Sequence, residues 1–309
     1  MDPLNPPCLI TPAPGLGIDA GGSRTRWALA TADGTIKAEG QVDGLSALQM
    51  GSAAGRQSVY AIFSELARAV HTHGHPLRVQ AGLTGFGGDG EQLQVWLAEL
   101  IGVERHQVVL CNDIEIAYFD SFATGQGYLV YAGTGSIGAF IDADGQFHRA
   151  GGRGVSLDDG GGGFWIAREA LRHIWRAEDE EPGCWRASAM AHAVFAHIGG
   201  ADWALSRQFI YGQERGEVGK LALAVAASAA QDAAAIAILQ QAGQELARLA
   251  QALTRRYGAR PVTLAGRAAE LHPLIFNAMR AALPDAISLT QTTAQPHHAA
   301  ARIAARALP

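Results

Sequence analysis

The sequence predicts an α/β protein built from two similar domains, and three observations indicate this. The chain has 309 residues, which is more than a single hydrophobic core usually supports. Short apolar runs of strand length alternate with segments of helical spacing. A unit of strand, glycine-rich turn, strand, Asp-Gly hairpin and strand occurs twice, first from Gly15 and again from Gly127. We therefore expect two domains of the same type that face each other.

The first copy of this unit leads into helices and further strands. Its second strand ends at Asp33-Gly34, a strong hairpin signal. Strands are expected at residues 15–19, 25–31, 35–42, 77–83 and 108–110, and helices at 57–71 and 90–101.

The second copy leads into a mostly helical, alanine-rich region. Asp232 is expected to cap a long helix that runs to about Tyr257, with Gly258 as its stop. The alanine-rich helices between Gly216 and Arg256 either pack in the core or form a dimer face, and we expect a homodimer. Strands are expected at 127–131, 137–141 and 261–264, and a last helix at 298–308.

Composition and charge argue against several classes of protein. The chain is 48% hydrophobic and 17% charged, and its net charge of -5 gives no electrostatic case for a nucleic-acid or membrane partner. Cys8, Cys111 and Cys184 form no CxxC pair, so neither a disulfide framework nor a cysteine-rich metal site is indicated. The start lacks the pattern of a signal peptide, and the longest apolar stretch, residues 221–230, is too short to span a bilayer. We expect a cytoplasmic protein.

Two glycine-rich turns are the candidates for phosphate binding, one within Gly17–Trp27 and one within Tyr131–Phe140. Glycines let backbone N–H groups approach a phosphate, and the hydroxyls add donors. Either turn alone is also compatible with a plain hairpin, whereas the pair is more specific. Asp19 stands at the end of the first strand, where a carboxylate can hold Mg²⁺ directly or through water. The candidate phosphate ligands are Gly21, Gly22, Ser23, Arg24, Thr25, Gly133, Thr134, Gly135 and Ser136.

Three further segments carry candidate residues. Asn112 and Asp113 lie between a buried strand and a helical run, where a carboxylate can accept a proton from a substrate hydroxyl or simply cap the helix. In the glycine-rich stretch from Gly151, Asp158 and Asp159 could bind sugar hydroxyls or a hydrated metal; a disordered loop is the alternative, but the apolar FWIA that follows must pack. The strand that ends at Ala265-Gly266 lets the backbone approach a flat ligand such as adenine.

In this order, these segments resemble the sugar-kinase, actin and heat-shock-chaperone ATPase superfamily. The GTGS turn followed by GFWIA is most similar to the N-acetylglucosamine kinases, whose wider group includes glucosamine kinases and the activator ATPases of 2-hydroxyacyl-CoA dehydratases. The resemblance implies two ribonuclease-H-like (actin-like ATPase) domains with a central cleft. Residues 1–112, completed by a C-terminal helix at about 291–309, would form the first domain, and residues 113–290 the second.

The resemblance also implies roles for single residues. Asp113 matches the catalytic base, Gly266 the adenosine motif, and Asp19 a position near Mg²⁺, so the expected cofactors are ATP and Mg²⁺. The expected reaction is phosphorylation of an amino-sugar hydroxyl, with N-acetylglucosamine converted to its 6-phosphate. The residues expected on the sugar side are Ser46, Thr84, Asn112, Asp113, Gly152, Arg153 and Asp159.

Departures from the family pattern lie on the sugar side. Leu48 stands where a sugar-binding Asn is expected, Met50 and Arg153 stand where Trp is expected, and Gly160 replaces an acidic residue after Asp159. Kinases for glucosamine or N-acetylmuramic acid therefore remain alternatives.

An activator-type ATPase is a further alternative, although its iron–sulfur cluster needs cysteines that the chain does not offer as a set. A non-catalytic sugar sensor is disfavoured because only about 14 residues precede the first strand, too few for a DNA-binding domain. His71, His73 and His75, and also His297-His298, are interpreted as surface histidines rather than metal ligands.

Overall fold

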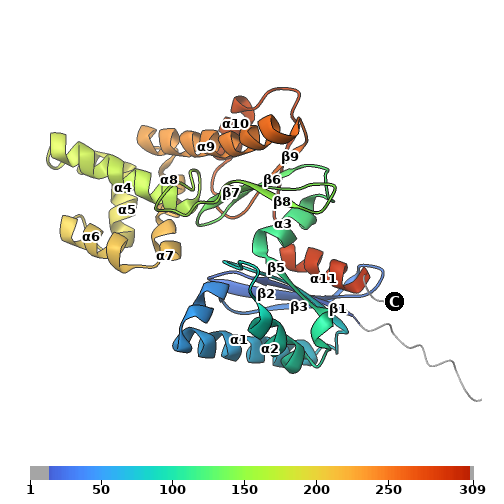
Figure 1. Cartoon of the computed structure of the whole chain (residues 1–309). Coiled ribbons are helices and arrows are strands. Elements are labelled where there is room, and N and C mark those ends of the chain that lie inside the picture. Colours follow the sequence, from blue (N-terminus) through green and yellow to red (C-terminus); the bar gives the residue numbers. More distant parts are fainter. Residues whose placement is uncertain (1–13, 307–309) are drawn as a thin grey trace, which may run out of the picture. The chain divides into compact units, whose positions relative to one another are not determined.

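The computed structural model describes residues 14–306, so Cys8 lies outside the described residues. The chain divides into two compact units (Figure 1). Unit 1 contains residues 14–120 and 295–306 of the described chain, and unit 2 contains residues 121–294.

Unit 1 is a five-stranded mixed sheet in the order β3-β2-β1-β4-β5. The strands β1, β2 and β3 form antiparallel hairpins, whereas β4 and β5 add in parallel. In Figure 1, α1 and α2 lie on one side of this sheet and α11 on the other. The elements are β1 (Gly15–Ala20), β2 (Arg24–Ala30), β3 (Ile36–Asp43), η1 (Ala47–Gly51), α1 (Ala53–His71), β4 (Arg78–Leu83), α2 (Glu91–Ile101), η2 (Arg105–Gln107), β5 (Val108–Asn112), α3 (Asp113–Ser121) and α11 (Pro296–Arg306).

The two faces of β1 explain how the helices pack on this sheet. Leu16 and Ile18 point into the core beneath α1 and α2 and are fully buried. Residues alternate along a strand, so Gly15 and Gly17 face α11. A Cβ on Gly17 would lie 2.1 Å from the backbone nitrogen of Ala301, so only glycine lets α11 pack this closely.

Unit 2 repeats the same sheet plan in the order β10-β9-β6-β7-β8. Strands β6, β7 and β8 form antiparallel hairpins, and β9 and β10 add in parallel. The predicted repetition of one folding unit is therefore confirmed. The elements are β6 (Tyr128–Ala132), β7 (Ser136–Ile141), β8 (Phe147–Gly151), α4 (Gly163–Glu180), η3 (Cys184–Ala187), α5 (Ala189–Ile198), α6 (Trp203–Gly212), α7 (Arg215–Gly219), α8 (Leu221–Ser228), α9 (Ala233–Tyr257), β9 (Val262–Ala265), α10 (Pro273–Ala282) and β10 (Leu289–Thr292).

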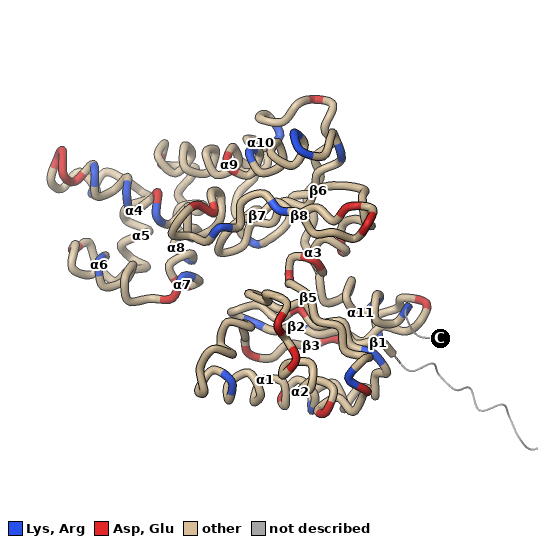
Figure 2. Tube along the Cα trace, in the orientation of Figure 1, with Lys and Arg blue, Asp and Glu red and all other residues tan. Residues whose placement is uncertain are grey.

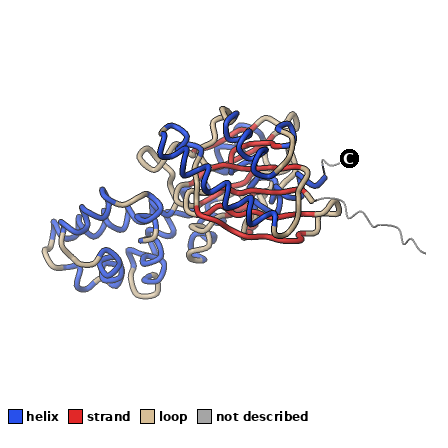
Figure 3. The backbone as a smooth tube through the Cα atoms, turned by 90° about the horizontal axis from the view of Figure 1, so that it is seen from below, coloured by secondary structure: helices blue, strands red, loops and turns tan. Residues whose placement is uncertain are grey.

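The helices of unit 2 fall into two groups. Helix α9 packs on the sheet and against α10, and its ends are as predicted: Asp232 accepts the N–H groups of Ala234 and Ala235, and Gly258 ends it. Helices α4–α8 form a helical lobe that extends from the strands (Figure 3). The sequence indicated this lobe only as an alanine-rich region and gave no sign of β10.

The division into units differs in detail from the domain limits expected from the sequence. Residues 113–120 belong to unit 1, because the Asp120 carboxylate in α3 accepts the N–H of Gln295 at 2.8 Å just before α11. Residues up to Ala294 belong to unit 2, because β10 pairs with β9.

Among residues 14–306, no single helix has the length and apolar character needed to cross a membrane. The α7–α8 segment and α9 pass that test only as a pair, and the pair bends by 118° at its break.

Candidate functional site

The first candidate phosphate turn connects β1 to β2 in unit 1. Gly21 closes it by donating its N–H to the Arg24 carbonyl at 3.0 Å, and the side of the turn at Gly22, Ser23 and Arg24 is exposed. The loop that follows β3 packs closely against this turn, because a Cβ on Gly44 would lie 2.3 Å from the Gly22 carbonyl oxygen. The backbone and the Ser23 hydroxyl on this exposed side are accessible to an anion.

Thr25 differs from its neighbours in this turn. Its side chain is fully buried, and its hydroxyl has no hydrogen-bond partner within the described part of the chain. Strand alternation explains this position, since Thr25 shares the core face of β2 with Trp27 and Leu29. Its expected contact with phosphate stays a prediction and gains no support from this placement.

Asp19 and Arg26 form a pair at the same end of the sheet. They lie directly opposite each other in the β1–β2 register, and Arg26 Nη2 is 2.7 Å from Asp19 Oδ2. Burial raises the pKa of Asp19 above its ordinary value against the lowering effect of Arg26, and the negative charges of Asp113 and Asp120 add to the rise. The Asp19 carboxylate is a hard oxygen ligand of the kind that Mg²⁺ prefers, and its position near Mg²⁺ stays a prediction. Sequence reasoning missed Arg26, although counting back from the hairpin turn places it opposite Asp19.

Asp113 begins α3 directly after β5, where acidic residues mark the first turn of the helix (Figure 2). Its two carboxylate oxygens have separate partners: Oδ2 accepts the hydroxyl of Thr84 at 2.5 Å, and Oδ1 accepts the N–H of Ile114 at 3.0 Å. Burial raises the pKa of Asp113, while these two hydrogen bonds lower it. A fixed carboxylate with a raised pKa is suited to accept a proton from a hydroxyl.

Asn112 performs the capping role that the sequence left open. Its side-chain oxygen accepts the N–H of Ile114 at 3.1 Å, and Glu115 in turn accepts the N–H of Asn112 at 3.0 Å. The Asn112 amide also donates to the Phe86 carbonyl at 3.3 Å. The cap at Asn112 fixes the first turn of α3, to which Asp113 belongs. Capping by Asn112 is therefore compatible with the expected role of Asp113 as a base.

The loop before η1 is joined to the Thr84 loop. The Ser46 hydroxyl donates to the Thr84 carbonyl at 3.0 Å and accepts the N–H of Leu48 at 3.3 Å. Leu48 is 75% exposed, and a Cβ on Gly85, which has φ +75°, would lie 2.7 Å from its Cγ. The predicted residues Ser46, Thr84 and Asp113 are thus linked by consecutive contacts, with an apolar Leu48 beside them.

The second candidate turn connects β6 to β7 in unit 2, and the start of α4 holds it. Gly163 and Phe164 donate their N–H groups to the carbonyls of Gly133 and Thr134, both at 2.9 Å. A Cβ on Gly162 would lie 2.6 Å from the backbone of Gly135, so this approach requires the glycine run. The disordered-loop alternative is wrong, because the run packs against the turn.

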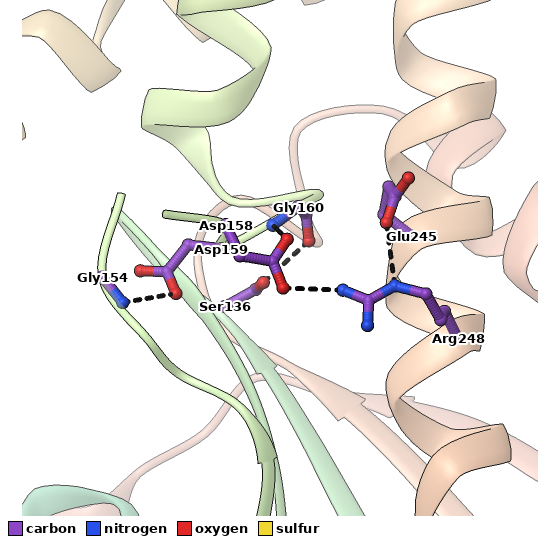
Figure 4. A network of polar contacts seen from close by, with 7 residues as sticks. All are labelled: Ser136, Gly154, Asp158, Asp159, Gly160, Glu245 and Arg248. Carbon is purple, nitrogen blue, oxygen red and sulfur yellow. Dashed lines mark hydrogen bonds and ion pairs between the residues drawn. The ribbon is translucent and has the colours of Figure 1, made fainter. Parts of the chain in front are cut away.

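Ser136 has a supporting contact in this turn. It is 4% exposed, and its hydroxyl donates to the Gly160 carbonyl at 2.7 Å, which ties the turn to the glycine run (Figure 4). Gly266 lies at the end of the neighbouring strand β9. It has φ +99°, and a Cβ there would lie 2.4 Å from the Ala132 carbonyl oxygen, immediately before the turn.

Asp159 lies against the second turn and not apart from it. It adopts φ 55°, is 8% exposed, and accepts the N–H of Gly154 at 3.1 Å (Figure 4). A Cβ on Gly135 would lie 2.2 Å from Asp159 Oδ2, so the carboxylate contacts the second turn directly. Burial raises the pKa of Asp159, and hydrogen bonds from the backbone of Gly154 and Arg153 lower it. The backbone of the 152–154 loop thus holds this carboxylate.

Asp158 has a different role from its neighbour. Its carboxylate pairs with Arg248 on α9 at 2.8 Å, and Arg248 also pairs with Glu245 at 3.1 Å (Figure 4). This network fixes the loop to α9. The sequence could not have indicated it, because the partners are 90 residues apart.

Known proteins resemble this chain in sequence and in fold. A sequence model of the BadF/BadG/BcrA/BcrD ATPase family matches residues 16–302. An N-acetyl-D-glucosamine kinase of Dictyostelium discoideum is 33% identical over 103 residues, which cover 32% of each chain, so the match spans about a third of that relative.

Solved structures resemble the whole chain. A candidate N-acetylglucosamine kinase from Chromobacterium violaceum has a TM-score of 0.70 and 25% identity, over 95% of this chain and 99% of that one. A ROK family glucokinase from Streptomyces griseus, solved with glucose and AMPPNP, has a TM-score of 0.58 and 15% identity over 95% and 98% of the two chains. The two mixed sheets are those of the two-domain actin-like ATPase fold, as the sequence predicted.

Proposed function

Because this chain belongs to the BadF/BadG/BcrA/BcrD ATPase family, we propose that it is an ATP-dependent sugar kinase whose substrate is an amino sugar. N-acetylglucosamine is the leading substrate, since the Dictyostelium and Chromobacterium relatives carry the name of an N-acetylglucosamine kinase. The proposed product is the 6-phosphate. The observation that carries the proposal is the Thr84–Asp113 pair at the start of α3, a fixed carboxylate with a raised pKa.

Each residue set has a role in this reaction. In unit 1 the exposed backbone at Gly22–Arg24 donates N–H groups to phosphate, and in unit 2 the N–H groups of Thr134 and Gly135 do so, since the Gly133 N–H already bonds to the Gly135 carbonyl. Asp113 Oδ2, now bonded to the Thr84 hydroxyl, accepts the proton of the attacking sugar hydroxyl. Asp19 would hold Mg²⁺, which neutralises phosphate charge when bound.

The sugar is bound beside these groups in the proposal. The Ser46 hydroxyl positions the Thr84 loop by donating to the Thr84 carbonyl. The exposed side chain of Leu48 offers an apolar contact to the substrate. Gly266 lies where the backbone can approach adenine, next to the second turn. Asp159 and the Gly152–Arg153 backbone bind a sugar hydroxyl or phosphate-bound water.

The test is a coupled ADP-release assay with the purified protein, ATP and Mg²⁺. Candidate substrates are N-acetylglucosamine, glucosamine, N-acetylmuramic acid, N-acetylmannosamine and glucose, and phosphorus NMR of the product identifies the position. We expect sugar-dependent ADP release that is strongest with an amino sugar. ADP release at the same rate without any sugar would instead indicate an activator-type ATPase, and no release with any sugar would refute the kinase.

A further inference from the structure

Three side chains meet at the start of α11, on the face of the unit 1 sheet that α11 covers. Glu39 comes from β3, and His297 and His298 come from the first turn of α11. One ligand atom from each lies within 4.8 Å of the other two, and no other such cluster of three is found among residues 14–306. The sequence pattern indicated surface positions for both histidines, yet His297 is only 6% exposed.

The fold explains why residues so far apart in sequence meet. Glu39 lies opposite Ala28 in the β2–β3 register, and Ala28 packs against Ala301 of α11. Strand alternation therefore directs Glu39 toward α11, on the face of the sheet opposite the main core. The first turn of α11 then brings its two histidines to the same edge.

The arrangement has the chemistry of a transition-metal site. His297 Nε2 lies 3.5 Å from Glu39 Oε2, and His298 Nε2 contacts the same oxygen. In a tetrahedral zinc site with bonds of about 2.0–2.1 Å, neighbouring ligand atoms are about 3.4 Å apart. The first distance fits this spacing, and all three ligand atoms lie within 4.8 Å of one another, so a small shift of the exposed Glu39 side chain and the imidazoles would form the site.

A second observation points to a ligand at this position. The His297 side chain is 8% exposed, and its Nδ1 has no hydrogen-bond partner within the described chain. Its other nitrogen has only the 3.5 Å contact with Glu39, which is long for a hydrogen bond. An ion bound at Nε2 would give this buried imidazole one strong partner; its proton would then stand on Nδ1, which keeps no partner within the described chain.

We propose that Glu39, His297 and His298 bind one divalent transition-metal ion, with Zn²⁺ as the best match, and that this ion fastens α11 to β3. Two imidazoles and one carboxylate favour Zn²⁺ over Mg²⁺, which prefers oxygen ligands. The 57% exposed Glu39 leaves a fourth position open to water. The positive charge of Arg26 acts on His297 and opposes the ion, but Asp19 pairs with Arg26.

The site is separate from the proposed kinase chemistry and differs from it in its consequence. Glu39 and His298 are 259 residues apart, so the ion would join the C-terminal helix to an early strand of unit 1. Binding to the folded state alone stabilises that state by mass action. The expected effect of Zn²⁺ is therefore on unfolding, whereas Mg²⁺ and ATP affect turnover.

The test uses the full chain after removal of metals with a chelator. Isothermal titration with Zn²⁺ measures binding, thermal unfolding with and without Zn²⁺ measures stabilisation, and visible absorption of bound Co²⁺ reports the ligand geometry. The variants are Glu39→Gln and His298→Ala. Matched controls are His106→Ala, at an exposed histidine on η2, and His73→Ala, which tests the other histidine-rich segment.

We expect one Zn²⁺ per chain, a rise in the unfolding temperature, and Co²⁺ absorption bands of a four- or five-coordinate site. Both cluster variants should weaken Zn²⁺ binding at least tenfold and lose the temperature rise, while both controls keep them. Zn²⁺ binding that survives in Glu39→Gln and His298→Ala, or that follows His73, would overturn the proposal and leave a hydrogen-bonded His–carboxylate pair only. None of these readouts depends on kinase activity, so the two proposals fail separately.

Discussion

Replacing Asp113 by Asn separates catalysis from folding at the proposed base. The amide keeps the size of the carboxylate, and its oxygen can still accept from Thr84 or from the Ile114 N–H, which now bond at 2.5 and 3.0 Å. One of these bonds weakens, a cost of about 0.5–1.5 kcal/mol in unfolding free energy. The amide cannot accept the proton of a sugar hydroxyl, so we expect kcat to fall by about 10²–10⁴-fold, or about 3–5.5 kcal/mol.

The pKa of Asp113 sets the sign of the effect on stability. Burial raises that pKa, so the folded protein binds this proton more tightly than the unfolded chain does. The resulting stabilisation is complete below the unfolded pKa and is lost as the pH rises through the folded value. Above the folded pKa the wild type bears a buried charge that Asp113→Asn removes, which offsets the weakened hydrogen bond. We expect the unfolding free energy to change by about 1 kcal/mol or less.

The assay compares kcat, ATP affinity and urea unfolding for wild type and Asp113→Asn with the best sugar. The expected result is a large loss of kcat with ATP binding and stability nearly unchanged. A kcat within about tenfold of wild type would refute the assignment of the base, because general-base catalysis contributes more than that. A large loss of stability would instead mean that the fold itself depends on the Asp113 carboxylate.

Three more substitutions test the neighbouring contacts. Thr84→Val removes a hydrogen bond that lowers the pKa of Asp113, so the acidic limb of the kcat–pH profile should move to higher pH; an unmoved limb would contradict the pairing. Gly135→Ala places a Cβ 2.2 Å from Asp159 Oδ2, and we expect a raised KM for ATP and a loss of about 1–3 kcal/mol in unfolding free energy, measured by kinetics and urea unfolding. Gly266→Ala combines φ +99° with a Cβ 2.4 Å from a carbonyl oxygen of β6, and should lower the unfolding temperature; an unchanged value would show that β9 can shift.

Much of the architecture follows from local patterns. The Asp-Gly hairpins and the repeated unit predict both sheets, because a hairpin turn and two alternating strands determine their own pairing. Asp232 and Gly258 mark both ends of α9 correctly, since caps act through the nearest backbone groups. The short strand β10 carries too few buried residues to give a pattern, and only its pairing with β9 makes it a strand.

The supporting contacts of the site were not predictable in the same way. The sequence indicates that Ser136 belongs to a glycine-rich turn, but its hydroxyl donates to Gly160, 24 residues away. Thr25 follows the exposed residues of its turn and yet lies in the core, because strand alternation starts there. Sequence motifs thus indicate which segments are candidates for ligand binding, whereas packing determines which of their side chains are exposed to a ligand.

The shared sheet plan also shows that the proposed base stands at only one of two equivalent junctions. In each sheet the outer parallel strand leads toward a helix of unit 1: β5 runs into α3, and β10 is followed by α11. The first junction presents Asp113, whereas the equivalent stretch after β10 reads Thr293-Ala294-Gln295 and carries no carboxylate. Gln295 is instead held by Asp120 of α3. The duplicated fold therefore supplies two candidate phosphate turns but a carboxylate at only one of these two junctions, so Asp113→Asn should remove the Asp113 ionisation from the acidic side of the kcat–pH profile.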